Sequence, residues 1–323
     1  MKILIIGGAG MVGQKLAQRL SKDGNLGGKE ITGLLLHDVV EAQKPQSAFP
    51  VTTAVSDLSL PGEAEKLVAD KPDVIFHLAA IVSGEAEQEF DKGYRINMDG
   101  TRDLLEAVRA AGNKPRIVFT SSIAVFGAPF PDAIGDEYFT TPLTSYGTQK
   151  AIGELLLADY TRKGFLDGIG IRLPTICVRP GKPNKAASGF FSNIIREPLA
   201  GHEAVLPVSE DVRHWHASPR AAVGFLIHAA TIDGAKVGPR RNLTMPGLSV
   251  TVGEQIAALQ KVAGDKVVAR IRREPDPVIM GIVAGWPRNF DTSRARSLGF
   301  TAESSFEEII RIHISDELGG KIA

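Results

Sequence analysis

The chain has 323 residues, of which 43% are hydrophobic and 23% are charged, a balance typical of a globular protein with a sizeable core. Basic and acidic residues both number 37, so no overall field favours binding to nucleic acid or to a membrane surface. The one cysteine, Cys177, allows no intramolecular disulfide and is interpreted as a core residue. The apolar run "ILII" is too short for a signal peptide and no stretch approaches a spanning helix, which predicts a cytoplasmic protein.

Short apolar runs alternate with longer helical patterns through the first half of the chain. Strands are expected at Lys2–Ile6, Ile31–His37, Val51–Val55, Val74–Leu78, Arg116–Thr120 and Gly170–Ile176. The helices expected between them are Met11–Lys22, Gly62–Ala69, Phe90–Ala111 and Ser145–Lys163. Apolar strands separated by helices predict an α/β fold, in which a doubly wound parallel (Rossmann) sheet is covered on both faces.

The alternation ends after Leu173, where "PTICVRPGKPNKAASG" predicts a loop over a cleft. Beyond it we expect a helix at Phe190–Leu199, a loop at Val205–Val212, a helix from about Ser218, a strand at Asn242–Met245, and helices at Val252–Val262 and Ser304–Ile314. Residues 1–173, with returning segments at about 213–235 and 290–300, are therefore expected to form the main sheet unit. Residues 174–323 are expected to form mainly a smaller, interleaved α/β substrate-binding cap.

A glycine turn joins the first strand to the first helix in "KILIIGGAGMVGQKLAQRL". The spacing Gly7-x-x-Gly10-x-x-Gly13 suits a backbone that turns sharply, approaches a pyrophosphate closely and packs helix on strand. The helix begins at Met11 and Val12, where free N–H groups and the positive end of the helix dipole attract an anion. Because the pattern follows a strand and opens a helix, it predicts a dinucleotide site.

The ends of the next strands complete the predicted dinucleotide site. Asp38 can accept hydrogen bonds from both ribose hydroxyls of an adenosine and repel a 2′-phosphate, which predicts NAD rather than NADP. The alternative is a solvated loop aspartate. His77 is interpreted as a packed residue at a strand end. Further positions expected near the cofactor are Asp57, Leu58, Leu78, Ala79 and Ala80.

The stretch "SYGTQKA" carries Tyr146 and Lys150 four residues apart, on one face of an expected helix. This pair alone decides nothing, because Tyr-x-x-x-Lys arises often by chance. Together, however, "GGAGMVG", "DVIFHLAA", "NMDGT", "FTSSIAVFG" and "SYGTQK" resemble the extended short-chain dehydrogenase/reductases, relatives of nucleotide-sugar 4-epimerases and dehydratases. The resemblance covers nearly the whole chain and is strong in residues 1–180.

The family resemblance implies a catalytic trio of Ser122, Tyr146 and Lys150, with Asn97, Tyr146 and Lys150 also contacting NAD. An ordinary tyrosine pKa of about 10 is too high for a base at neutral pH. A lysine ammonium and a positively charged nicotinamide ring would lower that pKa. Tyr146 could then take the proton of a substrate hydroxyl while hydride leaves the same carbon. The resemblance also implies a homodimer formed through the two long helices.

The substrate side departs from the nucleotide-sugar pattern. Where epimerases of this family carry Arg-x-x-Asn, "RLPT" has Thr175, and "RHWHASPR" keeps only Arg213 of another family segment. An arginine without a diphosphate to bind can hold a carboxylate through two hydrogen bonds. Arg213 is therefore the predicted carboxylate ligand, with Arg179 and Lys182 as further candidates. For each of the three, a solvent-facing or loop-bracing role is the alternative.

Three stretches, "GGAGMVGQKLAQRL", "RIVFTSSIAVFGAPFP" and "VRPGKPNKAASGFFSNIIREPLAG", resemble the D-erythronate dehydrogenase group of this family. This implies that the C2 hydroxyl of a four-carbon sugar acid, D-erythronate, is oxidised to a 2-oxo acid with NAD as acceptor. The residues then expected to hold the substrate are Ser83, Ser122, Tyr146, Thr175 and Arg213. No metal site is expected, because His214 and His216 have no obvious carboxylate or cysteine partner.

Two other functions remain open at this point. A UDP-sugar 4-epimerase would keep NAD bound and return the hydride to the opposite face of the sugar. A redox sensor or scaffold would bind NAD without catalysis, although such proteins tend to lose the tyrosine or the lysine that this chain keeps.

Overall fold

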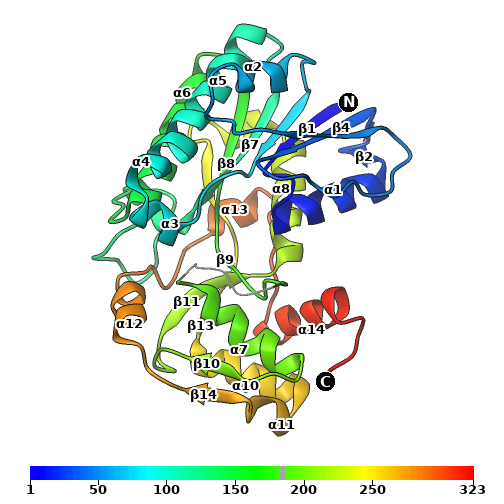
Figure 1. Ribbon diagram of the computed structural model, residues 1–323. Helices are drawn as coiled ribbons and strands as arrows, with labels where there is room; N and C mark the ends of the chain where they lie inside the picture. Colours follow the sequence, from blue (N-terminus) through cyan, green and yellow to red (C-terminus); the bar gives the residue numbers. More distant parts are fainter. Residues whose placement is uncertain (182–186) are drawn as a thin grey trace.

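A seven-stranded parallel sheet forms the centre of the protein (Figure 1). The computed structural model describes residues 1–181 and 187–323. Strand order across the sheet is β12-β8-β7-β6-β1-β4-β5, which confirms the doubly wound prediction. The strands are β1 (Lys2–Ile6), β4 (Gly33–Asp38), β5 (Val51–Val55), β6 (Val74–His77), β7 (Arg116–Ser122), β8 (Asp167–Leu173) and β12 (Asn242–Thr244).

The order of strands reverses between β1 and β6, which lie side by side although the chain leaves β1 for β4. Loops diverge at such a point, and a crevice opens there at the carboxyl edge of the sheet. Strand β12 joins the far edge of the sheet next to β8, outside the returning segments that the sequence predicts.

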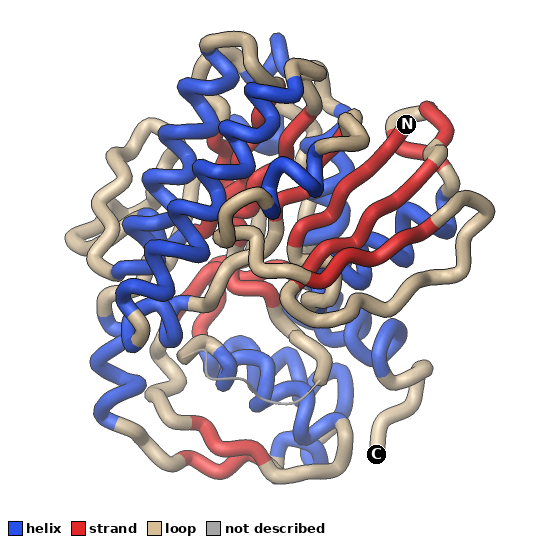
Figure 2. Tube along the Cα trace, turned by 45° about the horizontal axis from the view of Figure 1, so that its top comes forward, coloured by secondary structure: helices blue, strands red, loops and turns tan. Residues whose placement is uncertain are grey.

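Helices cover both faces of the sheet (Figure 2), and the alternating side chains of β1 show why its sequence is apolar throughout. Ile3 and Ile5 belong to the core beneath α1 (Met11–Asp23) and α8 (Pro219–Thr231). Leu4 and Ile6 belong to the opposite core. That second core is covered by α2 (Glu63–Val68), α5 (Gly100–Ala111) and α6 (Ser145–Arg162).

The long helix expected at Phe90–Ala111 is interrupted. The chain forms α4 (Phe90–Gly93), a π-helical turn (Tyr94–Asp99) and then α5, and the short helix α3 (Ser83–Gln88) precedes them. The wider turn carries Asn97, whose amide bonds the backbone of Ile81 in the loop after β6. Such turns are frequent at functional sites, and this one lies against the loop that enters the crevice.

The remaining chain forms a smaller part below the main sheet in Figure 1. Its strands form a three-stranded sheet, β9 (Thr175–Ile176), β11 (Arg213–Ala217) and β13 (Leu248–Thr251), and a parallel pair, β10 (Ala204–Leu206) and β14 (Ile271–Arg273). The larger helices here are α7 (Gly189–Leu199), α10 (Val252–Ala263), α12 (Pro277–Ala284) and α14 (Phe306–Glu317). Shorter elements of the chain are β2 (Asn25–Leu26), β3 (Lys29–Glu30), a 3₁₀ turn (Ile123–Val125), α9 (Gly234–Val237), α11 (Asp265–Val268) and α13 (Ser293–Ser297).

Two expectations about this second part are wrong. The strand expected at Gly170–Ile176 is split at Pro174, which has no N–H for a sheet ladder; β9 then leaves the main sheet and pairs with β11. The segment expected to be a loop from Val205 begins inside β10, which pairs with β14 across a long sequence separation. No local pattern signals that pairing.

A buried ion pair fastens α6 to the sheet. Arg172 on β8 donates to both carboxylate oxygens of Glu154 on α6, at 2.8 and 2.7 Å. Ser121 on β7 donates to the same carboxylate at 2.5 Å. Both charged side chains are almost completely buried. The pair therefore holds the helix that carries Tyr146 and Lys150 against the ends of two strands.

Glu154→Leu should destabilise the protein strongly, because it leaves the buried Arg172 guanidinium with only the more distant Asp136 carboxylate, 3.9 Å away. We expect a loss of about 3–5 kcal/mol in the free energy of unfolding, measured by urea denaturation. Lys261→Ala is the control, since its pair with Glu307 lies at the surface and should cost less than about 1 kcal/mol. Equal losses in the two variants would contradict the role assigned to the buried pair.

Candidate active site

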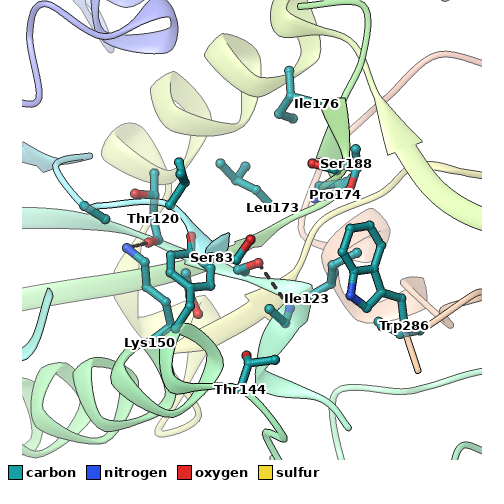
Figure 3. A pocket seen from close by; sticks show the side chains of 18 of the residues that line it. Ser83, Thr120, Ile123, Thr144, Lys150, Leu173, Pro174, Ile176, Ser188 and Trp286 are labelled. Atoms are coloured by element: carbon teal, nitrogen blue, oxygen red, sulfur yellow. Dashed lines mark hydrogen bonds between the residues drawn. The ribbon is translucent and has the colours of Figure 1, made fainter. Parts of the chain in front are cut away.

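A cavity of about 360 Å³ lies at the carboxyl edge of the main sheet, where β6, β7 and β8 end (Figure 3). Its other walls come from the start of α1, from α6 and from the second part of the chain. The predicted site residues that line it are Met11, Val12, Leu78, Ala80, Ser83, Ser122, Tyr146, Lys150 and Thr175. Predicted residues outside its lining are Gly7, Gly10, Gly13, Asp38, Asp57, Leu58, Ala79, Asn97 and Arg213.

Lys150 is a buried polar group that lines the cavity. Its Nζ donates a 2.8 Å hydrogen bond to the carbonyl of Thr120 on β7 (Figure 3), and the residue is 3% exposed. Burial lowers the Lys150 pKa to about 7, although the nearby Glu154 carboxylate opposes the shift. This amine can therefore gain or lose its charge near neutral pH.

Tyr146 lies one helical turn before Lys150, and the Lys150 Nζ is 5.8 Å from the centre of its ring. Enclosure of the phenol raises its pKa to about 12, against a hydrogen bond with Ser122 and the charge of Arg179, which both lower it. This burial opposes the lowering of the pKa that the sequence analysis expects from a lysine ammonium and a nicotinamide charge. Burial outweighs the hydrogen bond with Ser122 and the charge of Arg179.

Ser122 ends β7 and caps the following 3₁₀ turn, where its Oγ accepts a 3.1 Å hydrogen bond from the N–H of Ala124. That bond fixes the orientation of the hydroxyl oxygen. Helix α6 is fixed in a similar way, because the Thr144 side chain accepts from the N–H of Gly147 at its first turn. Two caps thus orient the serine and the tyrosine, which both line the cavity.

The glycine turn has the shape that a dinucleotide requires. Gly7 has a φ of +92°, and a Cβ placed on Gly13 would lie 2.2 Å from the Gly7 carbonyl oxygen. A Cβ on Gly10 would meet only that oxygen, at 3.4 Å, so the turn is open at the start of α1. Within residues 1–181 and 187–323 no side chain caps this helix, and its first turn has no acidic residue. The N–H groups are therefore free for a pyrophosphate.

Two carboxylates predicted to contact the cofactor are held by backbone and side-chain donors. Asp38 accepts from the N–H of Ala9 in the glycine turn at 2.9 Å and from Val39 at 2.7 Å, so it lies beside the turn as an adenosine ligand should. Asp57 instead bonds Ser59 and Arg95. The residues around the turn fit NAD.

Asn97 and His77 act within the protein framework. Asn97 accepts from the N–H of Ile81 at 2.9 Å and donates to Gln149 at 2.8 Å, so it ties the loop after β6 to α6. His77 is buried and hydrogen-bonds the Thr101 hydroxyl at 2.9 Å. The predicted contact of Asn97 with NAD stays a prediction.

Arg213 does not reach the cavity that contains Tyr146. Its guanidinium donates to the Ser249 carbonyl and pairs with Glu254 at 3.2 Å, and it lines a separate hollow together with Arg288. Arg213 lies on β11, and its partner Glu254 lies 41 residues later, in the first turn of α10. No sequence pattern signals this pairing.

Arg179 does line the Tyr146 cavity. It donates to the Ser188 hydroxyl at 2.6 Å and to the Ile176 carbonyl at 3.1 Å, and it pairs with no carboxylate among residues 1–181 and 187–323. Burial lowers its pKa. Lys182, the third basic candidate, lies outside the described residues.

Several cavity residues were not predicted from the sequence. Trp286, just after α12, lies across the cavity from Lys150 (Figure 3). Further lining residues are Pro287, His214, Ser188 and Leu143. No family motif marks them. The one signal is Trp286, two residues after the apolar segment "PVIMGIVA". The sequence analysis assigned neither the segment nor the tryptophan.

Cys177 is fully buried and its thiol contacts the Phe191 carbonyl at 3.3 Å. Burial raises its pKa to about 12, as befits the core residue expected. In the part of the chain that the structure describes, no three His, Cys, Asp or Glu side chains gather as metal ligands. Nor is any helix there long and apolar enough to cross a membrane.

The model of the NAD dependent epimerase/dehydratase family matches residues 3–232. The chain belongs to this family. NAD is accordingly its cofactor, as the glycine turn and Asp38 predict, and the family resemblance noted from the motifs is confirmed. The three-dimensional neighbours include the GalE-like L-threonine dehydrogenase from Cupriavidus necator, with a TM-score of 0.85 at 24% identity, which supports the fold alone.

The family member D-erythronate dehydrogenase from Cupriavidus necator is 47% identical over 320 residues, 98% of each chain. The enzyme of the same name from Haemophilus influenzae is 44% identical, over 98% of this chain and 100% of its own. A crystal structure from Agrobacterium tumefaciens, described as a nucleoside-diphosphate-sugar epimerase, is 70% identical with a TM-score of 0.98, covering 100% of this chain and 96% of that one. The curated relatives confirm the prediction of an NAD-dependent oxidoreductase acting on CH–OH.

Lys150→Met should change how stability depends on pH. Between the folded pKa of about 7 and the ordinary value of 10.5, the unfolded chain holds a proton on Lys150 that the folded chain has lost. The stability of the unmodified protein relative to the variant should therefore rise with pH in this window, by up to about 1.4 kcal/mol per pH unit.

Urea unfolding at pH values of about 6 and about 9 would measure this difference. Lys66→Met, at an exposed lysine, is the control and should show no such trend. A difference between Lys150→Met and the unmodified protein that is constant with pH would contradict the shifted Lys150 pKa.

Proposed function

We propose that this protein oxidises the C2 hydroxyl of D-erythronate to 2-oxo-D-erythronate with NAD as acceptor. The full-length similarity to two D-erythronate dehydrogenases supports this substrate. The single structural observation that carries it is the position of Arg179, which faces the cavity of Ser122, Tyr146 and Lys150 without a carboxylate partner among the described residues. A small acid would supply that partner.

Arg179 takes the role that the sequence analysis gave first to Arg213. Its planar guanidinium can donate two parallel hydrogen bonds to a carboxylate, and its partly buried position strengthens them. Arg213 is already paired with Glu254 in a different hollow. A cavity of about 360 Å³ that also receives the nicotinamide end of the cofactor suits a four-carbon acid better than a nucleotide sugar.

The reaction then follows from the three polar groups at the ends of β7 and α6. Ser122 holds the C2 hydroxyl oxygen, and Tyr146 removes its proton. Lys150 stabilises the resulting phenolate and is expected to bond the nicotinamide ribose, while the Thr120 carbonyl keeps the amine in place. When bound, NAD supplies the acceptor for the hydride that leaves C2 and a positive charge beside the phenol. Ser83 and Thr175, which line the same cavity, are proposed to hold the other hydroxyls.

A UDP-sugar 4-epimerase is the competing function, since a 70% identical structure is described as a nucleoside-diphosphate-sugar epimerase. Against it stand Thr175 at the place of the family asparagine and the pairing of Arg213 with Glu254. The absorbance of NADH decides between the two. We expect NADH from D-erythronate and no conversion of UDP-glucose or UDP-galactose, and the reverse result would overturn the proposal.

The sheet unit, residues 1–173 with returning segments, is proposed to bind NAD and residues 174–323 to supply the cap. A homodimer through the long helices is supported by Leu155 on α6 and Phe90, whose side chains are 69% and 57% exposed; sedimentation at micromolar concentration tests it. A cytoplasmic location is proposed because the one cysteine is buried and unpaired.

Tyr146→Phe should lower kcat by about 10²–10⁴-fold, the usual contribution of a positioned general base. NAD affinity, measured by calorimetry, should stay nearly unchanged because the ring remains. Tyr138→Phe is the matched control, since that hydroxyl bonds the Pro129 carbonyl at the surface. Undiminished turnover in Tyr146→Phe would remove the base from the mechanism.

Arg179→Leu should raise KM for D-erythronate about tenfold to hundredfold, the cost of losing a charge-assisted hydrogen bond. Arg213→Leu serves as the comparison, and we expect its KM to change less than about threefold because its charge is already paired. Steady-state NADH formation measures both. A larger effect at Arg213 than at Arg179 would restore the assignment made from the sequence.

A further inference from the structure

His214 is a buried residue that joins two walls of the cavity. It lies on β11 and is 3% exposed. Its Nδ1 is 3.0 Å from the Pro287 carbonyl oxygen and its Nε2 is 2.7 Å from the Thr175 hydroxyl. All three residues line the cavity that contains Tyr146.

These contacts fix the positions of the protons. A carbonyl oxygen can only accept, so Nδ1 of His214 must carry the proton that bonds Pro287. A neutral imidazole has one N–H, and its other nitrogen is an acceptor. The hydroxyl proton of Thr175 must therefore point to Nε2 of His214.

The surroundings keep this imidazole neutral and prevent it from turning. Its ring stacks on Phe191 with a centroid distance of 5.2 Å and an angle of 6°, and Trp286 lies 5.2 Å away on another side. Burial lowers the His214 pKa to about 4, despite the opposing hydrogen bond to Pro287. A single tautomer is therefore present at neutral pH.

The hydrogen bond to His214 limits how the Thr175 hydroxyl can bind a ligand. A threonine hydroxyl has one proton and two lone pairs, and its proton is committed to His214. Towards the cavity Thr175 can only accept a hydrogen bond. A substrate hydroxyl can donate to the Thr175 oxygen. A carboxylate oxygen has no proton to donate, so its lone pairs and those of Thr175 repel each other. Arg179, on the same cavity, can only donate.

We propose that His214 is a positioning residue that restricts the Thr175 hydroxyl to accepting hydrogen bonds from the substrate. Thr175 then binds the hydroxyl end of a sugar acid and not its carboxylate. A substrate hydroxyl donates to Thr175 while the carboxylate accepts from Arg179. This inference rests on the proposed function, because it assumes a substrate with a carboxylate at one end and a hydroxyl at C3 or C4.

The test compares D-erythronate with its 3-deoxy and 4-deoxy analogues. For the unmodified protein, kcat/KM should fall about tenfold to hundredfold for the analogue that lacks the hydroxyl donating to Thr175, since the acceptor is then left unpaired. Thr175→Ser should keep this discrimination and Thr175→Val should reduce it to about twofold or less.

His214→Gln and His214→Phe separate positioning from mere packing. The Gln amide oxygen can replace Nε2 as the acceptor for Thr175, so this variant should keep most of the discrimination. Phe keeps the stacking on Phe191 but accepts no hydrogen bond, so the freed Thr175 hydroxyl can donate or accept and discrimination should fall at least about fivefold. His214→Phe with the same discrimination as the unmodified protein would overturn the proposal.

The imidazole ¹⁵N resonances of the unmodified protein give a readout that needs no substrate. We expect His214 in the Nδ1–H tautomer, with an Nε2 resonance that shifts in Thr175→Val. An Nε2–H tautomer would overturn the inference. Absence of NADH formation from D-erythronate would instead overturn the proposed function, and the resonances would still report whether Thr175 donates to His214.

Discussion

The hydrogen bond from Lys150 to the Thr120 carbonyl is the contact on which the rest of the site depends. It joins α6 to the carboxyl end of β7 inside the protein. Ser122 lies two residues beyond its acceptor, and Tyr146 one turn before its donor. One buried bond thus brings together a serine from a strand and a tyrosine from a helix. The ion pair of Arg172 on β8 with Glu154 on α6 holds the same helix against the sheet.

Burial gives the two groups of this site opposite pKa shifts. It raises the pKa of the Tyr146 phenol and lowers that of the Lys150 amine. Both shifts disfavour charge, because burial penalises the ionised form of each group. The sequence analysis expects a lysine ammonium and a nicotinamide charge together to lower the Tyr146 pKa. Any such lowering has to overcome the cost of burying a phenolate.

What could be predicted from the sequence follows from how local each signal is. The strand β1, the glycine turn and the trio of Ser122, Tyr146 and Lys150 lie in short segments whose spacing carries the information, and the sheet follows from apolar strands between helices. The sequence analysis ranks Arg213 above Arg179, because no local pattern signals the pairing of Arg213 with Glu254, which joins distant segments. His214 and Trp286 reach the cavity through packing alone, for which the sequence has no motif.

Oxidation at C2 of D-erythronate is the central claim, and D-erythronate carrying deuterium at C2 tests it most directly. The account predicts that the deuterium leaves the acid and is recovered in the reduced NAD, seen by NMR, with a 2-oxo acid as product. Deuterium that stays in the acid while NADH forms would show oxidation at another carbon. That result would contradict the assignment of the C2 hydroxyl to Tyr146.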